Sequence, residues 1–358
     1  MKVVFCGDIS VKNDNARLFA EQDLENLFND VPIVLKGADM VVANLECAVT
    51  DKDTPIQKCG PNLAAPFGTV EVLKAAGVTH CALSNNHIFD YGKAGLYDTL
   101  AELAKNGIPY TGIGENIQDA RKDLILTDGK VKVAVVNVCE HEYSCALEDR
   151  VGAREFDPFE TADDIVEAKK NADYVVLVYH GGKEHCEYPS PRLKKLCRSM
   201  VKRGADLVLC QHSHCIGTYE EYEGGSILYG QGNFHFVSSS YSADNEKWNT
   251  GLMVEVEFGD RLQVKFIPVK VEGLGIRLAT ADEAKRILGQ LHERSKALVD
   301  GSWKDRWHEF CYTVPYYSQI GNCIPEDKRE LFGHFLDCEA HEDVLKELFP
   351  TCNLINEK

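Results

Sequence analysis

Carboxylate, amide and imidazole side chains follow the apolar segments of this sequence, at the points where those segments end. The residues concerned are Asp8, Glu46, Asn86, His87, His180, His212 and His214. Such oxygen and nitrogen ligands suit Mn, Fe or Zn ions, and a carboxylate shared by two ions is typical of two-metal hydrolases. One such residue would mean little, because Asp and Asn often end strands as turn formers. Their recurrence at five strand ends indicates a metal site.

The segment from Cys81 to Gly92, CALSNNHIFDYG, shows how such residues are placed. Its apolar start predicts the end of a buried strand, and the three residues 84–86 predict a turn. A helical pattern begins near Gly95. In α/β folds, ligands bind at the carboxyl ends of the strands, which is where this turn would lie. The alternative is an Asn-rich turn with a surface histidine.

Strand-like runs alternate with helical patterns along most of the chain, which predicts an α/β fold. The predicted strands are 2–6, 40–43, 78–83, 124–127, 132–138, 173–179, 205–210 and 226–229, followed by the antiparallel runs 251–258 and 262–271. The predicted helices are 16–36, 69–76, 95–106, 160–171 and 189–203. Beyond residue 276 the pattern becomes helical, at 281–298 and 326–348, around an aromatic stretch at 303–323.

The charge of the chain limits its partners. Its 358 residues include 39 Lys and Arg against 56 Asp and Glu, which gives a net charge of −17. This argues against wide contact with nucleic acid or with an anionic membrane, because both need clustered cations. It leaves room for a small anionic substrate that a metal ion holds.

Nothing in the sequence predicts export or a membrane span. No run approaches the ~18 apolar residues of a spanning helix, and the start MKVVFCGDIS lacks the pattern of an export signal. The fourteen cysteines are scattered, and none forms a CxxC pair. We therefore expect reduced thiols and a cytoplasmic location.

Six motifs occur in order within residues 1 to 240. They are GD (7–8), NLE (44–46), SNNHIFDYG (84–92), HGGKE (180–184), GADLVLCQHSH (204–214) and LYGQGNF (228–234). Together they resemble the bacterial capsule-synthesis, poly-γ-glutamate biosynthesis (CapA-like) family of the calcineurin-like metallophosphatase superfamily. The resemblance implies a four-layer αββα sandwich of two mixed sheets in residues 1–275 and a helical extension in residues 276–358.

The resemblance also implies a role for each candidate ligand. Glu46 would bridge two divalent transition-metal ions. The ligands of the first ion would be Asp8 and His214. The ligands of the second ion would be Asn86, His180 and His212.

Other residues would act on the substrate. The resemblance implies that His87, steered by Asp90 or by a backbone carbonyl, gives a proton to the leaving group or stabilises the charged transition state while a metal-activated water attacks. Lys183 and Arg192 are candidate anion contacts. The alternative is that both are solvated charges at the start of a helix.

Three positions depart from the superfamily pattern. Ser10 stands where a histidine is usual, so the first ion would lose one imidazole and bind more weakly. Gly181 replaces a tryptophan, which is expected to open the space above that strand. Gln211 takes the place of a small residue before His212.

Three classes of function stay open. The first, which we favour, is a metal-dependent hydrolase of a phosphoester or a γ-glutamyl amide, with a small anionic or polyanionic substrate. The second is a non-catalytic accessory protein for anionic polymer synthesis. The third is a structural zinc module in which Cys81, Cys186 and Cys215 help the histidines, although the lack of paired cysteines argues against it. The sequence indicates no oligomeric state.

Overall fold

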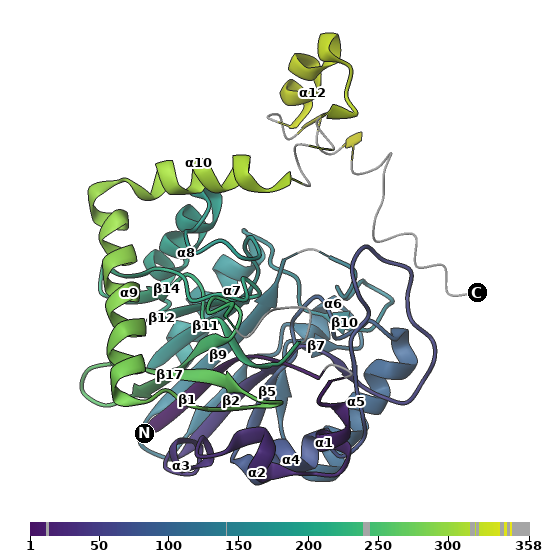
Figure 1. Cartoon of the computed structure of the whole chain (residues 1–358), viewed down its shortest axis with the longest axis vertical. Helices are drawn as coiled ribbons and strands as arrows, with labels where there is room; N and C mark the ends of the chain where they lie inside the picture. Colours follow the sequence, from purple (N-terminus) through teal and green to yellow (C-terminus); the bar gives the residue numbers. More distant parts are fainter. Residues whose placement is uncertain are drawn as a thin grey trace.

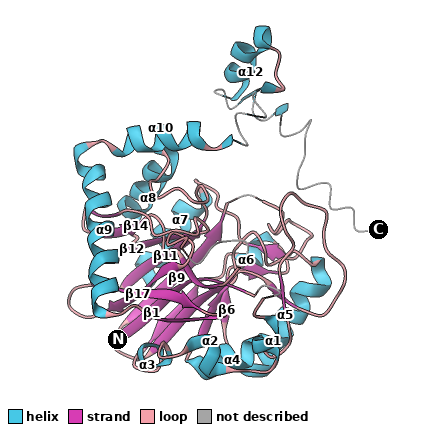
Figure 2. Cartoon of the chain, viewed as in Figure 1, coloured by secondary structure: helices cyan, strands magenta, loops and turns pink. Residues whose placement is uncertain are grey.

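Two β-sheets lie face to face in the centre of the molecule, and helices cover their outer faces (Figures 1 and 2). The structure is a computed structural model that describes residues 1–11, 14–140, 142–238, 244–315, 319, 322–336, 340–341 and 344–345. The predicted αββα sandwich of two mixed sheets is confirmed.

The first sheet has eight strands in the order β18-β17-β16-β1-β2-β5-β6, and β15 also pairs with β1. β1, β2, β5, β6 and β15 are parallel, whereas β16, β17 and β18 are antiparallel. The bounds are β1 Lys2–Ser10, β2 Met40–Leu45, β5 His80–Ala82, β6 Tyr110–Thr111, β15 Asn233–Phe236, β16 Thr250–Glu257, β17 Gln263–Glu272 and β18 Gly275–Leu278.

The second sheet has six strands in the order β13-β14-β12-β11-β9-β8. Its four central strands are parallel, and both edge strands are antiparallel. The bounds are β8 Leu124–Thr127, β9 Lys132–Cys139, β11 Tyr174–His180, β12 Leu207–Gln211, β13 Tyr219–Tyr222 and β14 Gly225–Leu228. Two small two-stranded sheets pair β3 (Ala48–Val49) with β4 (Ala64–Ala65) and β7 (Ile113–Gly114) with β10 (Gly152–Ala153).

The helices that cover the sheets are mostly short. Beside the first sheet lie α1 Ala16–Ala20, α2 Leu24–Phe28, α3 Pro32–Leu35, α4 Thr69–Ala76 and α5 Gly92–Asn106. Beside the second sheet lie α7 Glu160–Asn171 and α8 Pro191–Arg203, and a one-turn helix, α6 Ile117–Ala120, precedes β8. The chain continues into α9 Ala281–Asp300, α10 Trp303–Thr313, the short 3-10 turn η1 Glu326–Lys328 and α12 Arg329–Leu336.

Three hydrophobic cores separate the four layers. Successive side chains of a strand point to opposite faces, so β1 sends Val3 and Phe5 to the core between the sheets. Val4 and Cys6 point to the core under α1, α2, α4 and α5. In the same way, β11 sends Val176 inward. The outer face of its sheet packs against α7 and α8. Strands buried on both faces explain the continuous apolar runs in the sequence.

The C-terminal helices begin by closing the sandwich. α9 runs beside the sheets and contacts β13 and β17 (Figure 1). Its Ile287 and Leu291 join the core between the sheets. α10 then turns across the end of α8, and α12 stands away from the sandwich (Figure 1). The division of the chain into residues 1–275 and 276–358 stays a prediction.

The structure differs from the predictions for three segments. The helix predicted at 16–36 is three short helices, because Gln22 and Asn29 have positive φ values of 58° and 43° and Asp23 caps α2. The aromatic stretch 303–323 contains α10, in which Trp303, Trp307 and Phe310 follow helical spacing. The helix predicted at 326–348 begins with η1 and α12, and its remainder falls partly outside the described residues.

Candidate metal centre

The candidate ligands come together where the carboxyl ends of the two sheets meet. Asp8 lies near the end of β1, Glu46 directly follows β2, and His180 is the last residue of β11. The loop after β12 brings His212 and His214, and the loop after β5 brings Asn86. All of these side chains are buried. The fold thus brings together the residues that the sequence analysis expects to share one site.

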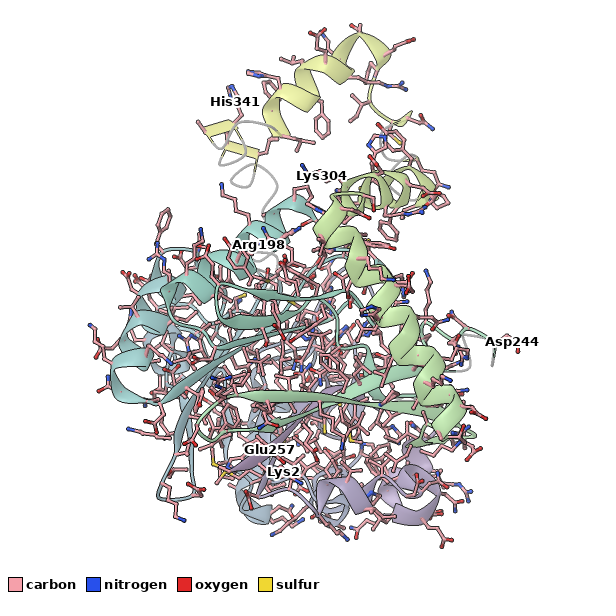
Figure 3. All side chains as sticks on the ribbon, turned by 90° about the vertical axis from the view of Figure 1, so that its left-hand side faces the viewer. Lys2, Arg198, Asp244, Glu257, Lys304 and His341 are labelled. Carbon is pink, nitrogen blue, oxygen red and sulfur yellow. The ribbon has the colours of Figure 1, made fainter. Side chains whose placement is uncertain are left out.

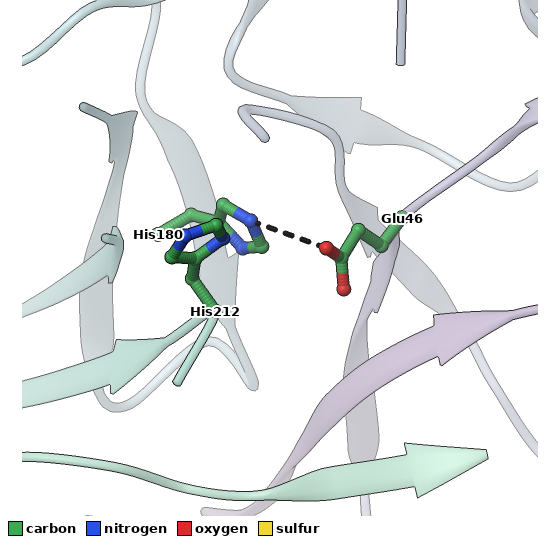
Figure 4. Close-up of side chains that lie close together, drawn as sticks. All are labelled: Glu46, His180 and His212. Carbon is green, nitrogen blue, oxygen red and sulfur yellow. Dashed lines mark ion pairs between the residues drawn. The ribbon is translucent and has the colours of Figure 1, made fainter. Parts of the chain in front are cut away.

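Two groups of three ligand atoms share Glu46. In one group the atoms come from Glu46, His180 and His212, and in the other from Asp8, Glu46 and His214, each within 4.8 Å of one another. Figure 4 shows the first group, in which His180 Nε2 lies 3.5 Å from Glu46 Oε1. His214 Nε2 lies 4.0 Å from the same oxygen. The arrangement suits a carboxylate that bridges two cations.

Several polar atoms of this centre have no hydrogen-bond partner among the described residues. They are both carboxylate oxygens of Glu46 and Nδ1 of His212. A buried polar atom without a hydrogen bond is costly, and native proteins rarely tolerate several together. Carboxylate oxygens and imidazole nitrogens are also the donors that Mn, Fe and Zn prefer. The residues present therefore fit bound divalent transition-metal ions.

Asparagines fix the ligands in place. Asn44 Nδ2 donates to Asp8 Oδ1 at 2.7 Å and lies 3.1 Å from His180 Nδ1. Asn233 Oδ1 lies 2.9 Å from His214 Nδ1, which leaves Nε2 of that ring facing Glu46. The backbone N–H of His212 donates to Asp8 Oδ2 at 2.9 Å. Such outer contacts set the tautomer and orientation of metal-binding side chains.

Burial sets the protonation of the centre. It lowers the pKa of His180 to about 4 and that of His212 to about 3, so both rings are neutral at pH 7 and can act as ligands. Burial and the nearby Glu46 raise the pKa of Asp8 to about 7. Burial also raises the pKa of Glu46 well above its usual value. Two carboxyl groups this close are expected to give up their protons when a cation arrives.

The two histidines of the QHSH motif have a strained backbone. His212 and His214 have φ values of 78° and 51°, in the left-handed region that residues other than glycine seldom adopt. Each costs on the order of 1–3 kcal/mol, and such strain persists where the surrounding structure holds it. The loop thereby turns both rings toward Glu46.

His87 and Asp90 form a pair beside the ligands. His87 Nδ1 lies 2.6 Å from Asp90 Oδ2. Asp90 also accepts from Lys58 Nζ at 2.6 Å and from the backbone N–H of Leu63 at 2.7 Å. Asn86 Oδ1 lies 2.9 Å from His180 Nε2, which places the loop of His87 directly against the candidate metal ligands. Neither group of ligand atoms contains His87.

The expectation that Gly181 opens the space above its strand is wrong, because Glu140 fills that space. A Cβ at Gly181 would lie 2.4 Å from Cγ of Glu140. Glu140 accepts from the Gly182 N–H and from the Tyr179 hydroxyl, both at 2.9 Å. A carboxylate therefore occupies the place that a large side chain at position 181 would need.

The two candidate anion contacts both lie close to carboxylates. Arg192 donates to Glu140, and its side chain is otherwise mostly exposed. Lys183 Nζ lies 3.8 Å from Glu184. Their role toward an anion stays a prediction.

Ser10 and Gln211, the other two positions that depart from the superfamily pattern, differ in their hydrogen bonding. The Ser10 hydroxyl is buried and has no hydrogen-bond partner within the described ranges. Gln211 Nε2 donates to the Cys6 carbonyl and to Gln231 Oε1, each at 3.2 Å, and so links the two sheets. Gln211 thus has a structural role, because its side chain joins the two sheets beside His212.

Cysteines take no part in the centre as described. Neither group of potential ligand atoms found in the described residues contains a thiol. Burial raises the pKa of Cys81 and Cys215 to about 12 and that of Cys186 to about 11, which keeps them protonated. The structural zinc module is not supported.

Sequence reasoning missed several residues of the centre. Lys58 comes from the long loop 50–66, and its side chain is 2% exposed. Asn44, Glu140 and Asn233 hold ligands or their neighbours. Asn44 and Asn233 lie inside the NLE and LYGQGNF motifs, which was a usable signal. No sequence signal pointed to Lys58.

Comparison with known proteins identifies the family. The family described as "Bacterial capsule synthesis protein PGA_cap" matches residues 2–238. The chain belongs to this family. The match covers all six motifs and every candidate residue of the centre.

Three curated relatives extend this result. The capsule biosynthesis protein CapA of Bacillus anthracis is 31% identical over 66% of this chain and 60% of its own length. The PGA biosynthesis protein CapA of Bacillus subtilis (strain 168) is 31% identical over 65% of this chain and 62% of its own length. A probable polyglutamine synthesis accessory protein of Mycobacterium tuberculosis is 25% identical over 73% of both chains. The match thus spans about three fifths of the length of the two CapA proteins. Within the part of this chain that the structure describes, no helix is long and apolar enough to cross a membrane.

Proposed function

We propose that this member of the capsule synthesis family is a metal-dependent hydrolase that acts on a γ-glutamyl amide or a phosphoester. The observation that supports this most is Glu46, a buried carboxylate that both groups of candidate ligands share and whose oxygens lack hydrogen-bond partners in the described structure. The Bacillus subtilis relative is named a PGA biosynthesis protein, which favours a γ-linked glutamate polymer as the source of the substrate.

The ligand sets proposed are unequal. One ion would be held by Asn86, His180 and His212 together with Glu46, and the other by Asp8, His214 and Glu46. Divalent ions there would lower the pKa of a water molecule toward ~7 and stabilise negative charge on the substrate. Glu46 and Asp8 supply the negative charge that holds two cations in a buried site.

His87 is the residue proposed to handle the proton. Its contact with Asp90 orients the ring and holds Nδ1, so that Nε2 is the atom that can pass a proton to the leaving group. Lys58 balances the charge of Asp90 and keeps the carboxylate in position. Asp90 and Lys58 act through His87 and are positioning residues.

A second candidate, a non-catalytic accessory protein, also has support. The Mycobacterium tuberculosis relative is named as a probable accessory protein. Ser10 in place of a histidine leaves the Asp8 side with fewer strong ligands. A protein of this kind would keep the fold and one ion without turnover.

Turnover separates the two candidates. We expect protein loaded with Mn²⁺, Zn²⁺ or Fe²⁺ to hydrolyse a chromogenic phosphodiester or a γ-glutamyl anilide, and we expect a chelator to abolish the reaction. Product release should be followed by absorbance, with each metal tested alone. Failure of every metal and substrate pair would contradict the hydrolase and favour the accessory protein.

Metal binding should occur in two unequal steps. The Asp8 and His214 side lacks the usual second imidazole because Ser10 has replaced it, so it should bind its ion more weakly. Calorimetric titration of metal-free protein should resolve both steps, and His214→Ala should remove the weaker step while keeping the stronger one. Two equal affinities in the unmodified protein would show that another group completes the weaker site.

A further inference from the structure

A groove between α8 and the start of α10 collects positive charge on a chain whose net charge is −17. The groove has a volume of about 640 Å³. Its cations are Lys194, Lys195, Arg198, Lys202 and Lys304. Among the described residues, no acidic side chain lines it. Figure 3 shows Arg198 and Lys304 close together where the two helices meet.

Aromatic rings support these cations. Lys194 Nζ lies 4.6 Å from the centre of the Trp303 ring, and the Arg198 guanidinium lies 4.4 Å from that of Tyr222. Cations are attracted to the faces of such rings, so the rings hold positive charge at the groove without neutralising it. Burial and the neighbouring Arg198 lower the pKa of Lys194. The ring contacts thus hold Lys194 and Arg198 of α8 in place at the groove.

Much of this charge is not balanced. Arg198 is paired with Glu220, and Lys202 lies 3.3 Å from Glu223. Lys195 and Lys304 are exposed and form no ion pair with any described residue. The Lys194 side chain is buried, and its only hydrogen-bond acceptor among the described residues is the backbone carbonyl of Leu298, at 3.3 Å. An anion in the groove would meet two exposed cations, Lys195 and Lys304, that no described carboxylate neutralises.

We propose that this groove docks an extended chain of γ-linked glutamate. Lys194, Arg198 and Lys202 are four residues apart on α8, which places them about 6 Å apart along the helix axis. A γ-linked residue has five backbone bonds instead of three, so its extended length is also about 6 Å, compared with about 3.6 Å for an α-linked residue. Successive carboxylates can therefore come within reach of Lys194, Arg198 and Lys202, in competition with Glu220 and Glu223 for the last two. The identity of the polymer rests on the proposed function, whereas the evidence for a cationic groove is independent of it.

The groove starts at the sheet edge that carries the metal centre. Pro191, the first residue of α8, lines the groove. The next residue, Arg192, bonds to Glu140, which also accepts from the Gly182 N–H just after His180. A chain that leaves the centre along α8 would thus enter the groove, which would act as a docking site for polymer outside the centre.

Binding of fluorescent poly-γ-glutamate, measured by anisotropy at low salt, tests this proposal. The double variant Lys195→Glu/Lys304→Glu should bind roughly ten- to a hundredfold more weakly than the unmodified protein, since two attractions become two repulsions. The control is Lys36→Glu/Lys130→Glu, which makes the same change in net charge at exposed lysines outside the groove. It should bind within about twofold of the unmodified protein, because distant surface charges are screened by salt.

Several outcomes would overturn the proposal. They are no binding by the unmodified protein, equal loss in both double variants, and competition by α-linked polyglutamate or oligothymidylate as strong as that by the γ-linked chain. His212→Ala should still bind the polymer, because the groove does not include the metal ligands. Normal binding without hydrolysis would overturn the proposed hydrolase and keep the groove. Loss of binding in His212→Ala alone would place the polymer at the metal centre and overturn the groove.

Discussion

Glu46→Gln is expected to lose both metal ions at once. Glutamine keeps the size of the side chain but removes the charge that both groups of ligands share. The loss in affinity should exceed the roughly 10–100-fold cost of removing an outer-shell partner, because Glu46 would contact the ions directly. Metal content per chain and turnover should be measured on the same sample, and both should fall together.

The metal-free form of this variant should be at least as stable as the unmodified protein. Glu46 raises the pKa of the buried Asp8, so removing its charge relieves a like-charge contact. Glu102→Gln is the matched control, because Glu102 is also buried and has one carboxylate oxygen without a partner in the described part of the chain. That control should keep its metal. One tightly held ion in Glu46→Gln would mean that Glu46 does not bridge the two sites.

His87→Ala is expected to separate catalysis from metal binding. His87 contacts Asp90 and belongs to neither group of ligand atoms, so its loss should leave metal content and folding almost unchanged. Turnover should fall by roughly 10²–10⁴, the usual contribution of a positioned acid or base. His212→Ala should instead lose metal and activity together, because it removes a ligand. Metal stoichiometry and hydrolysis should be measured side by side in both variants.

His80→Ala controls for the loss of a histidine near the same strand. His80 is half-buried at the start of β5 and contacts Thr79, away from the ligands. It should keep metal and activity. Full activity in His87→Ala, with an inactive His212→Ala, would show that the centre is catalytic but that another group handles the proton.

The α/β class could be predicted because apolar runs and helical patterns alternate so regularly, whereas the four layers followed from the resemblance to the capsule-synthesis family. β8, α4 and α7 have the bounds that the sequence predicts. The failures have local causes. The helix predicted at 16–36 is broken where Asp23 caps a new helix and Asn29 adopts positive φ, and both are short-range effects that hydrophobic spacing does not show. β15 was missed because only four residues form it, and its pairing with β1 is a long-range contact.

The clustering of the candidate ligands could be predicted because each lies at or after the end of a strand, and strand ends meet at one edge. The residues that hold the ligands were harder to find. Lys58 reaches Asp90 from a polar loop, where a lysine is ordinarily solvated. Glu140 fills the space over Gly181, a contact that requires the pairing of β9 with β11. Such contacts arise from the tertiary fold and leave no periodic pattern in the sequence.

Anomalous X-ray scattering from crystals soaked in Mn²⁺ would test the shared carboxylate most directly. We predict two anomalous peaks on either side of Glu46, about 3.5–4 Å apart as in other two-metal sites. One peak should lie near His180 and His212, and the weaker one near Asp8 and His214. Crystals of Glu46→Gln should show neither peak. A single peak that Glu46 does not contact, or no peak in the unmodified protein at saturating Mn²⁺, would contradict the proposed centre.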